Sequence, residues 1–394
     1  EEMSKIAPHL ANFKGFYEEA TSARNYPYKS AANILGYLSE VYREEIEVDH
    51  FYKPSNNIGR AGIERFYEKE LRGIKGIKYI VTSALNNAIE SYADGKYDTT
   101  ARQADPLKMG MDVELQTYGE ELMSHKKGCI VAIEPSTGEI LAFVSSPGYD
   151  PNKLVGKNFS KNYSEFAANP YRPLFIRPLQ GKYSPGSAFK PLDALLALSE
   201  GVVTPSATFN CPGYYIAGNR RFKCEHVDGN TNLRWGISRS CNTYFYNIFA
   251  KMMTKNGTSR AKQQAAYDVW KNKVRKFGIG DTLGIDLPSE KAFKLYRPKD
   301  YDQMYGKRWG NTTIMSVAIG QGEISTTPLQ MANIMAIIAN RGYYIKPHVV
   351  KAIGDDKKID PKYKEKHFVD IDAKYFEPVI DGMQDAVNTN TGTA

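Results

Sequence analysis

Ser187 and Lys190 lie three positions apart in the segment Ser184-Pro185-Gly186-Ser187-Ala188-Phe189-Lys190-Pro191. At that spacing on a helix the two side chains share one face, so the lysine amine can reach the serine hydroxyl. A serine hydroxyl is a poor nucleophile until a neighbour removes its proton, and a lysine whose pKa is lowered by burial can accept that proton. The pair therefore indicates a serine nucleophile at a helix start, although Ser-x-x-Lys alone occurs by chance in many proteins.

A second motif, Ser240-Cys241-Asn242, follows further along the chain. In a short turn, alternate residues can point the same way, so we expect Ser240 and Asn242 to face a cleft while Cys241 points into the body. Ser240 could then relay a proton, and Asn242 could hydrogen-bond a substrate amide. Ser-x-x-Lys together with such a triplet resembles the signature of β-lactamases and penicillin-binding proteins.

Three of the four cysteines fall within one short window that also contains a histidine. The set Cys211, Cys224, His226 and Cys241 is chemically suited to a tetrahedral, structural zinc ion. A disulfide between Cys211 and Cys224, with Cys241 simply buried, is an open alternative because exported proteins commonly pair cysteines. Three reduced thiols are the other alternative. Cys129 lies in an apolar run and is expected to pack in the core.

The elements expected around these motifs are of both kinds. Strand-like runs at 129–133 and 140–144 flank a Pro/Gly turn and predict a hairpin, and apolar periodicity predicts an amphipathic helix at 113–123. Residues 187–200 predict a helix that is buried on most sides. Residues 1–110 alternate short helical and extended pieces and show no concentration of catalytic residue types. We therefore expect an α+β protein.

Composition excludes several classes of function. The chain has 394 residues, enough for two or three domains, and its net charge of +8 comes from basic residues that alternate with acids. Because a nucleic-acid binder concentrates its charge in a stripe, no nucleic-acid partner is expected. The longest apolar runs are also much shorter than the roughly 20 residues of a membrane span.

Several segments resemble class B penicillin-binding proteins, in particular the elongation-type penicillin-binding protein 2. The similar segments cover almost the whole chain and are Gly62 to Gly73, Ala132 to Ala142, Phe209 to Gly213, Gly284 to Pro288, Ile319 to Gly322 and Thr327 to Gln330. The resemblance implies a pedestal, or dimerisation-like, domain over residues 1–110. It implies a transpeptidase domain with a central antiparallel sheet over residues 111–394.

The resemblance also implies an activity, partners and a location. The activity is peptidoglycan DD-transpeptidation during cell elongation, with Ser187 acylated by a D-Ala-D-Ala stem peptide, Lys190 as its base, Ser240 as proton shuttle and Asn242 orienting substrate. No cofactor is needed for this chemistry, and zinc would be structural. Partners would be stem peptides, β-lactams, a SEDS-type membrane glycosyltransferase and rod-complex scaffold proteins. The catalytic part would lie in the periplasm, held to the inner membrane by an N-terminal anchor outside this chain.

One departure from the family pattern concerns its third motif, Lys-Thr-Gly on a late strand. Asn390-Thr391-Gly392-Thr393-Ala394 has Asn where the Lys should be. We interpret it as the Gly-Thr-Ala that follows a helix resembling Phe376 to Val387, upstream of the true motif. The chain is therefore expected to stop before the Lys-Thr-Gly strand, which makes the transpeptidase domain incomplete.

Three other functions compete with transpeptidation. A β-lactam sensor would be acylated without cross-linking anything, but it does not need the pedestal-like first 110 residues. A serine β-lactamase must activate water, and we find no Glu in a plausible deacylation loop. A septal class B penicillin-binding protein is the nearest rival, and the pedestal signature favours the elongation type.

Overall fold

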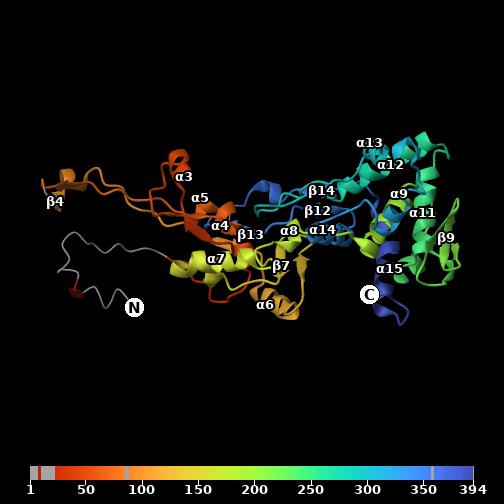
Figure 1. The fold of residues 1–394 in the computed structure, drawn as a ribbon, viewed down its shortest axis with the longest axis horizontal. Helices are drawn as coiled ribbons and strands as arrows, with labels where there is room; N and C mark the ends of the chain where they lie inside the picture. The colour runs from red at the N-terminus through yellow and green to blue at the C-terminus, as the bar shows by residue number, and fades with distance from the viewer. Residues whose placement is uncertain (1–7, 10–22, 85–87, 356–358, 394) are drawn as a thin grey trace.

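The computed structural model describes residues 8, 9, 23–84, 88–355 and 359–393, and it is elongated (Figure 1). The N-terminal elements lie at one end of the long axis. The helices α11 (Asn242–Thr254), α12 (Arg260–Lys276) and α13 (Pro298–Tyr305) lie at the other (Figure 1). Within the residues just named, no helix combines the length and apolar character that a membrane span requires.

The N-terminal region consists of short elements. β1 pairs with β2 and β3 pairs with β4, both antiparallel, and the β3–β4 hairpin forms the far tip of the molecule (Figure 1). The elements are α2 (Ala32–Leu35), β1 (Leu38–Glu40), α3 (Arg43–Val48), β2 (Asn57–Gly59), α4 (Gly62–Phe66), α5 (Glu68–Leu71), β3 (Ile80–Thr82), β4 (Ala88–Ser91), η2 (Tyr92–Gly95) and β5 (Leu107–Met109).

The middle of the molecule contains the predicted hairpin, which is confirmed. β6 (Gly128–Ile133) pairs antiparallel with β7 (Ile140–Ser146), and α6 (Val113–Leu122) packs against β7. The α+β class is also confirmed. The ladders that the structure describes are two-stranded. The backbone N of Ile140 donates to the His348 carbonyl and the backbone N of His348 donates to the Gly138 carbonyl, which continues the hairpin toward β13 (Val350–Ile353).

The predicted helix at 113–123 is present, but the face that it buries differs from the apolar stripe expected. Leu115, Tyr118 and Leu122 are exposed, whereas Gln116 and Gly119 are buried. The Gln116 amide oxygen accepts a hydrogen bond from the Phe143 backbone N at 2.7 Å, so the side chain gives this backbone donor of β7 a hydrogen-bond partner. A Cβ on residue 119 would lie 2.9 Å from Val144, which explains the glycine there.

The rest of the chain is mainly helical, and the helices between residues 190 and 276 form a lobe at the end of the molecule opposite the N-terminal elements (Figure 1). The remaining helices and turns are η3 (Pro151–Leu154), η4 (Gly156–Asn158), α7 (Phe159–Ala168), α8 (Arg177–Gln180), η5 (Gly186–Phe189), α9 (Lys190–Ser199), α10 (Leu233–Ser238), α11 (Asn242–Thr254), α12 (Arg260–Lys276), α13 (Pro298–Tyr305), η6 (Gly306–Arg308), η7 (Met315–Ile319), α14 (Pro328–Ala339), η8 (Pro361–Tyr363), η9 (Ala373–Tyr375) and α15 (Phe376–Asn388). The remaining strands are β8 (Phe209–Cys211), β9 (Tyr214–Ala217), β10 (Arg220–Lys223), β11 (Gly229–Thr231), β12 (Tyr343–Ile345) and β14 (Lys366–Phe368).

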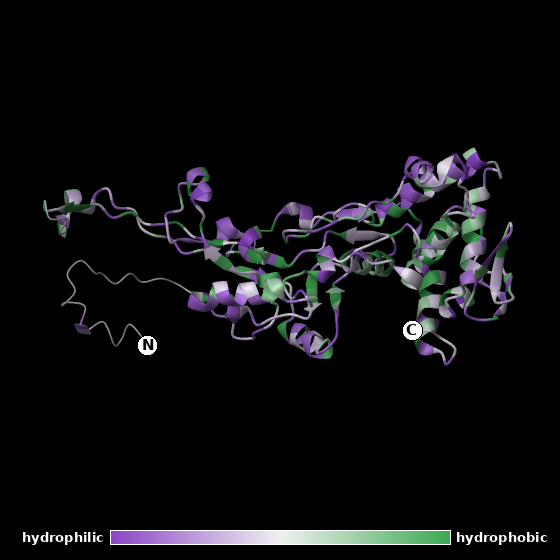
Figure 2. Cartoon of the chain, viewed as in Figure 1, coloured by the Kyte–Doolittle hydropathy of each residue, from purple (hydrophilic) through white to green (hydrophobic). Residues whose placement is uncertain are grey.

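The helix α9 lies at the centre of this lobe. Almost all of its residues are buried, and it packs against α11, α12 and α15. Hydrophobic residues concentrate in α11 and its neighbours, whereas the outer N-terminal helix α3 is hydrophilic (Figure 2). The buried helix predicted from the apolar run after Ser187 is therefore confirmed, and its first turn is held by a packed core.

A buried carboxylate ties the N-terminal region to the rest of the molecule. Asp286 accepts hydrogen bonds from the backbone N of Val349 at 2.6 Å, from that of Val350 at 2.9 Å and from the Tyr67 hydroxyl at 2.7 Å. Tyr67 lies between α4 and α5, so this carboxylate joins elements far apart in the sequence. The β5 strand, at the end of the N-terminal region, also pairs with β13, so backbone hydrogen bonds join the N-terminal region to the rest of the molecule.

Candidate active site

Ser187 lies on η5, directly before α9 begins at Lys190. The serine side chain is exposed, whereas Lys190 is only 2% exposed. Pro191 in the first turn of α9 suits a helix start because its missing N–H would have no partner there. The turn therefore presents a nucleophile to solvent while it keeps the adjacent amine in the core.

The turn before Ser187 is supported from behind by the Ile319 to Gly322 segment. The backbone N of Gly186 donates to the carbonyl of Gly320 at 2.8 Å. Gly320 has a φ of 66°, and a Cβ there would lie 2.3 Å from the Gly186 carbonyl oxygen. Only glycine fits this position, and the close backbone contact fixes the turn that carries the nucleophile.

The second motif completes a chain of hydrogen bonds. Ser240 Oγ donates to Ser187 Oγ at 2.8 Å, and Lys190 Nζ donates to Ser240 Oγ at 2.8 Å. Ser240 has a φ of 53°, a backbone conformation that is rare for a residue with a side chain and that concentrates at functional sites. In the described chain the lysine thus reaches Ser187 through Ser240, whereas the sequence spacing suggested direct contact.

Asn242 is held at the same junction. Its side-chain Oδ1 accepts a hydrogen bond from Lys190 Nζ at 2.7 Å, and its Nδ2 donates to the Lys223 carbonyl at 3.4 Å. The Lys190 ammonium also donates to the Ser240 carbonyl at 2.6 Å. The predicted residues Ser187, Lys190, Ser240 and Asn242 therefore lie together in one network.

Burial sets the protonation behaviour of the lysine. Desolvation lowers the pKa of Lys190 to about 8, although the nearby Cys224, Cys241 and Glu225 act in the opposite direction. An ammonium group that titrates near neutral pH can lose its proton at modest cost. Lys190 can therefore act as a base in this position.

The chain after α15 forms a turn. Residues 389–391 have no strand structure, and the Thr391 carbonyl accepts a hydrogen bond from Arg239 at 2.6 Å. Thr393 Oγ1 donates to the Ser238 carbonyl at 3.1 Å, and Ala394 lies outside the described residues. Asn390 therefore lies in a turn and not on a strand.

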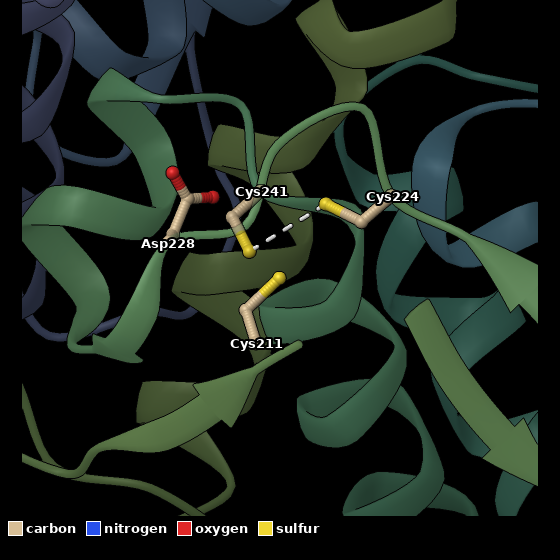
Figure 3. Close-up of side chains that lie close together, drawn as sticks. All are labelled: Cys211, Cys224, Asp228 and Cys241. Carbon is tan, nitrogen blue, oxygen red and sulfur yellow. Dashed lines mark hydrogen bonds between the residues drawn. The ribbon is translucent and has the colours of Figure 1, made fainter. Parts of the chain in front are cut away.

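Behind the Ser240 turn, three cysteines and an aspartate converge (Figure 3). The ligand atoms of Cys211, Cys224, Asp228 and Cys241 all lie within 4.8 Å of one another. All three cysteines are free thiols, and the sulfurs of Cys224 and Cys241 are 3.8 Å apart, well beyond the roughly 2.05 Å of a disulfide. The structure therefore has the thiol arrangement that the zinc hypothesis requires.

The fourth group differs from the prediction. Asp228 occupies the place expected for His226, because β11 pairs with β8 so that Gly229 lies opposite Cys211 and brings the preceding aspartate to the sulfurs. His226 contacts the cluster through its backbone: its carbonyl accepts from Cys211 Sγ at 3.5 Å, and its backbone N–H hydrogen-bonds Cys224. The sequence signal for Asp228 was an acid immediately before a strand, but it can be recognised only once the strand pairing is known.

The chemistry of these four groups fits a zinc ion. The hydrogen bond with Cys241 lowers the pKa of Cys224, which favours the thiolate form of Cys224. The Asp228 side chain is only 2% exposed; Oδ1 lies 3.4 Å from Arg239, while the buried Oδ2 has no hydrogen-bond partner. A buried oxygen without a partner next to a thiolate is well suited to bind a cation.

Comparison with known proteins gives a consistent set of relatives. The profile of the penicillin-binding protein transpeptidase domain matches residues 128–394, and that of the penicillin-binding protein dimerisation domain matches residues 1–107. Peptidoglycan D,D-transpeptidase MrdA of Acinetobacter baumannii is 35% identical over 89% of this chain, and MrdA of Escherichia coli K12 is 31% identical over 100%. The chain spans 51% and 62% of the lengths of these two relatives.

Solved structures show the same architecture. Pseudomonas aeruginosa PBP2, crystallised with WCK 5153, superposes with a TM-score of 0.77 at 30% identity and covers 96% of this chain and 78% of its own. Helicobacter pylori PBP2, solved in complex with MreC, gives a TM-score of 0.83 at 25% identity and covers 100% of this chain and 70% of its own.

Proposed function

This chain belongs to the penicillin-binding protein transpeptidase family, and on that premise we propose that it catalyses DD-transpeptidation of peptidoglycan in cell elongation. The observation that carries the proposal is the hydrogen-bonded series Ser187, Ser240 and Lys190, which ends on a buried amine. The match to MrdA and PBP2 proteins supports the elongation type over the septal type.

The positions of Ser187, Ser240 and Lys190 indicate the role of each in the reaction. When Lys190 is neutral, the hydrogen bonds can reverse, so that Ser187 donates to Ser240 and Ser240 donates to Lys190. Ser187 Oγ then attacks the carbonyl of the penultimate D-Ala, and its proton moves along this series to Lys190. The C–N bond to the terminal D-Ala breaks, the leaving amine takes the proton from Lys190 by way of Ser240, and an ester links the stem peptide to Ser187. An amine of a second stem peptide then attacks the ester carbonyl; the ester bond breaks, and the proton that this amine loses passes through Lys190 and Ser240 to Ser187 Oγ.

The partners and the location are also proposals. Helicobacter pylori PBP2 has been solved with MreC, and another similar structure comes from a peptidoglycan synthase complex. We propose a rod-complex scaffold protein and a SEDS-type membrane glycosyltransferase as partners of the natural protein. We further propose that an inner-membrane anchor keeps the catalytic part in the periplasm.

Reaction with a β-lactam separates this function from that of a β-lactamase. Full-length protein would be mixed with a chromogenic cephalosporin, and ring opening would be followed alongside intact mass. The proposal requires one stoichiometric burst of ring opening and a long-lived adduct. Continuous turnover of the cephalosporin would instead identify a hydrolase.

The rate of Ser187 acylation is expected to rise with pH through about 8. The base must be neutral to accept a proton, and the pKa of Lys190 is lowered to about 8, so the reactive fraction grows as pH rises through that value. The measurement is the second-order rate constant for acylation by a fluorescent penicillin between pH 6 and 10. A profile that falls over this interval would exclude a neutral-lysine base.

We also propose that Cys211, Cys224, Asp228 and Cys241 hold one structural zinc ion. Four protein ligands fill a tetrahedral site and leave no position for a reacting water. Cys241 lies between Ser240 and Asn242 in sequence, so a metal would fix the catalytic turn from behind. Removing the metal should lower the melting temperature and slow acylation together.

The choice between Asp228 and His226 gives a matched test of the metal site. Asp228→Asn is expected to weaken zinc binding by about tenfold or more, whereas His226→Asn should leave it unchanged. Elemental analysis and competition with a chromogenic chelator measure the two variants, with Cys224→Ser as the variant that should lose most zinc. Metal-free wild-type protein prepared without chelator, or a larger effect at His226, would contradict the assignment.

A further inference from the structure

The β9–β10 hairpin borders the catalytic network directly. The Lys223 carbonyl on β10 accepts the hydrogen bond from Asn242 Nδ2, and Cys224 follows immediately in the cysteine cluster. The backbone N of Cys224 donates to the Gly213 carbonyl at 2.9 Å, which closes the base of the hairpin. The hairpin is therefore fixed at the edge of the site; it lies beside α11 (Figure 1).

The two faces of the hairpin have different partners. Tyr215 and Phe222 are directly opposed across the strands, and both rings pack on Tyr246 of α11, with centroids 5.8 and 5.4 Å away. Because side chains alternate along a strand, Arg221 and Lys223 project from the opposite face. Both are exposed.

This outer face combines positive charge with apolar surface. The Arg221 guanidinium lies 3.7 Å from the centroid of the Tyr214 ring, which holds the long side chain in place. Ile216, directly opposite Arg221, is 60% exposed. An exposed isoleucine and a half-buried tyrosine beside two cations match a peptide that carries both aliphatic side chains and carboxylates.

The cations on this face are unpaired. Among the described residues, no carboxylate is within ion-pair distance of Arg221 or Lys223, whereas Arg239 nearby is paired with Asp228. Glu225 lies two positions after Lys223 in the sequence but forms no ion pair with Lys223 or Arg221 in the part of the chain that the structure describes. Positive charge next to an active site attracts anionic substrates and orients them.

From this arrangement we propose that the β9–β10 hairpin binds the free carboxylates of the stem peptide, away from the bond that is broken. The inference rests on the proposed transpeptidase function and adds a specificity determinant to it. Arg221 and Lys223 are the binding residues, and Tyr214 and Ile216 provide the apolar contact. A peptide whose side carboxylates are amidated should therefore bind less well than the free acid.

The test uses two synthetic pentapeptides that end in D-Ala-D-Ala and differ only at a γ-linked D-glutamate, whose α-carboxyl is free or amidated. Each peptide competes with a fluorescent penicillin for Ser187 in the full-length protein. In Arg221→Glu/Lys223→Glu, the half-inhibitory concentration of the free acid should rise about tenfold or more, since attraction becomes repulsion. The half-inhibitory concentration of the amide should change less than about twofold, and added salt should weaken the binding of the free acid only.

The matched control is Lys153→Glu/Lys161→Glu, which makes the same charge change on exposed residues near and on α7, toward the other end of the molecule. It should leave both peptides unchanged. Arg221→Gln, a milder variant, should reduce the preference for the free acid in the same direction if the double variant unfolds. If the double variant is labelled normally by penicillin but the half-inhibitory concentrations of both peptides change equally, the hairpin proposal is wrong and the proposed function stands. Failure of the wild-type protein to label Ser187 would overturn the proposed function and this inference with it.

Discussion

Ser187→Ala is expected to abolish covalent labelling by penicillin completely. Ser187 is the exposed hydroxyl at the end of a hydrogen-bonded series that leads to a buried amine, and no other atom can replace its Oγ. Intact-protein mass spectrometry after incubation with excess penicillin measures the adduct directly. Ser184→Ala is the matched control, because Ser184 is also exposed and lies three positions before Ser187. Stoichiometric labelling of Ser187→Ala would show that another residue is the nucleophile.

Lys190→Arg should slow acylation nearly as much as Lys190→Ala, by about 100-fold or more. Arginine stays protonated at any accessible pH, so it preserves the positive charge but cannot accept the serine proton. The rate constant for acylation by fluorescent penicillin distinguishes a base from a fixed charge. Substantial acylation by the arginine variant would mean that Lys190 serves mainly as a charge.

Packing must be controlled in that comparison because Lys190 is almost fully buried. Melting temperatures of both variants show whether the larger guanidinium disturbs the core around α9. Lys182→Arg, an exposed position shortly before the nucleophile, controls for the substitution itself and should be neutral. A slow Lys190→Arg protein with an unchanged melting temperature would isolate the loss of the base.

Local patterns predicted the elements that carry the nucleophile. The apolar run after Ser187 requires a buried helix, and the strand-turn-strand pattern at 129–144 requires a hairpin; both are present. The spacing of Ser187 and Lys190 placed them on one helical segment. Such signals depend on neighbours in the sequence, which is why they can be read without a structure.

Features that depend on distant contacts could not be predicted in the same way. The role of Asp228 follows from the pairing of β8 with β11, which the cysteine spacing does not reveal. The connection of Lys190 to Ser187 through Ser240 depends on how α9 meets the following turn. The face of α6 that is buried is not the one that carries its apolar residues, because the Gln116 side chain accepts a hydrogen bond from the backbone of β7. At this helix, a tertiary hydrogen bond decided the orientation more than the pattern of hydrophobic residues did.

In the proposed reaction the acyl group on Ser187 passes to an amine. Full-length protein would receive a pentapeptide ending in D-Ala-D-Ala together with a D-amino acid as acceptor, and products would be quantified by mass spectrometry. We expect release of D-Ala, exchange of the acceptor into the peptide, and loss of both in Ser187→Ala. A stable acyl-enzyme without exchange, or transfer to water alone when the acceptor is in excess, would exclude transpeptidation.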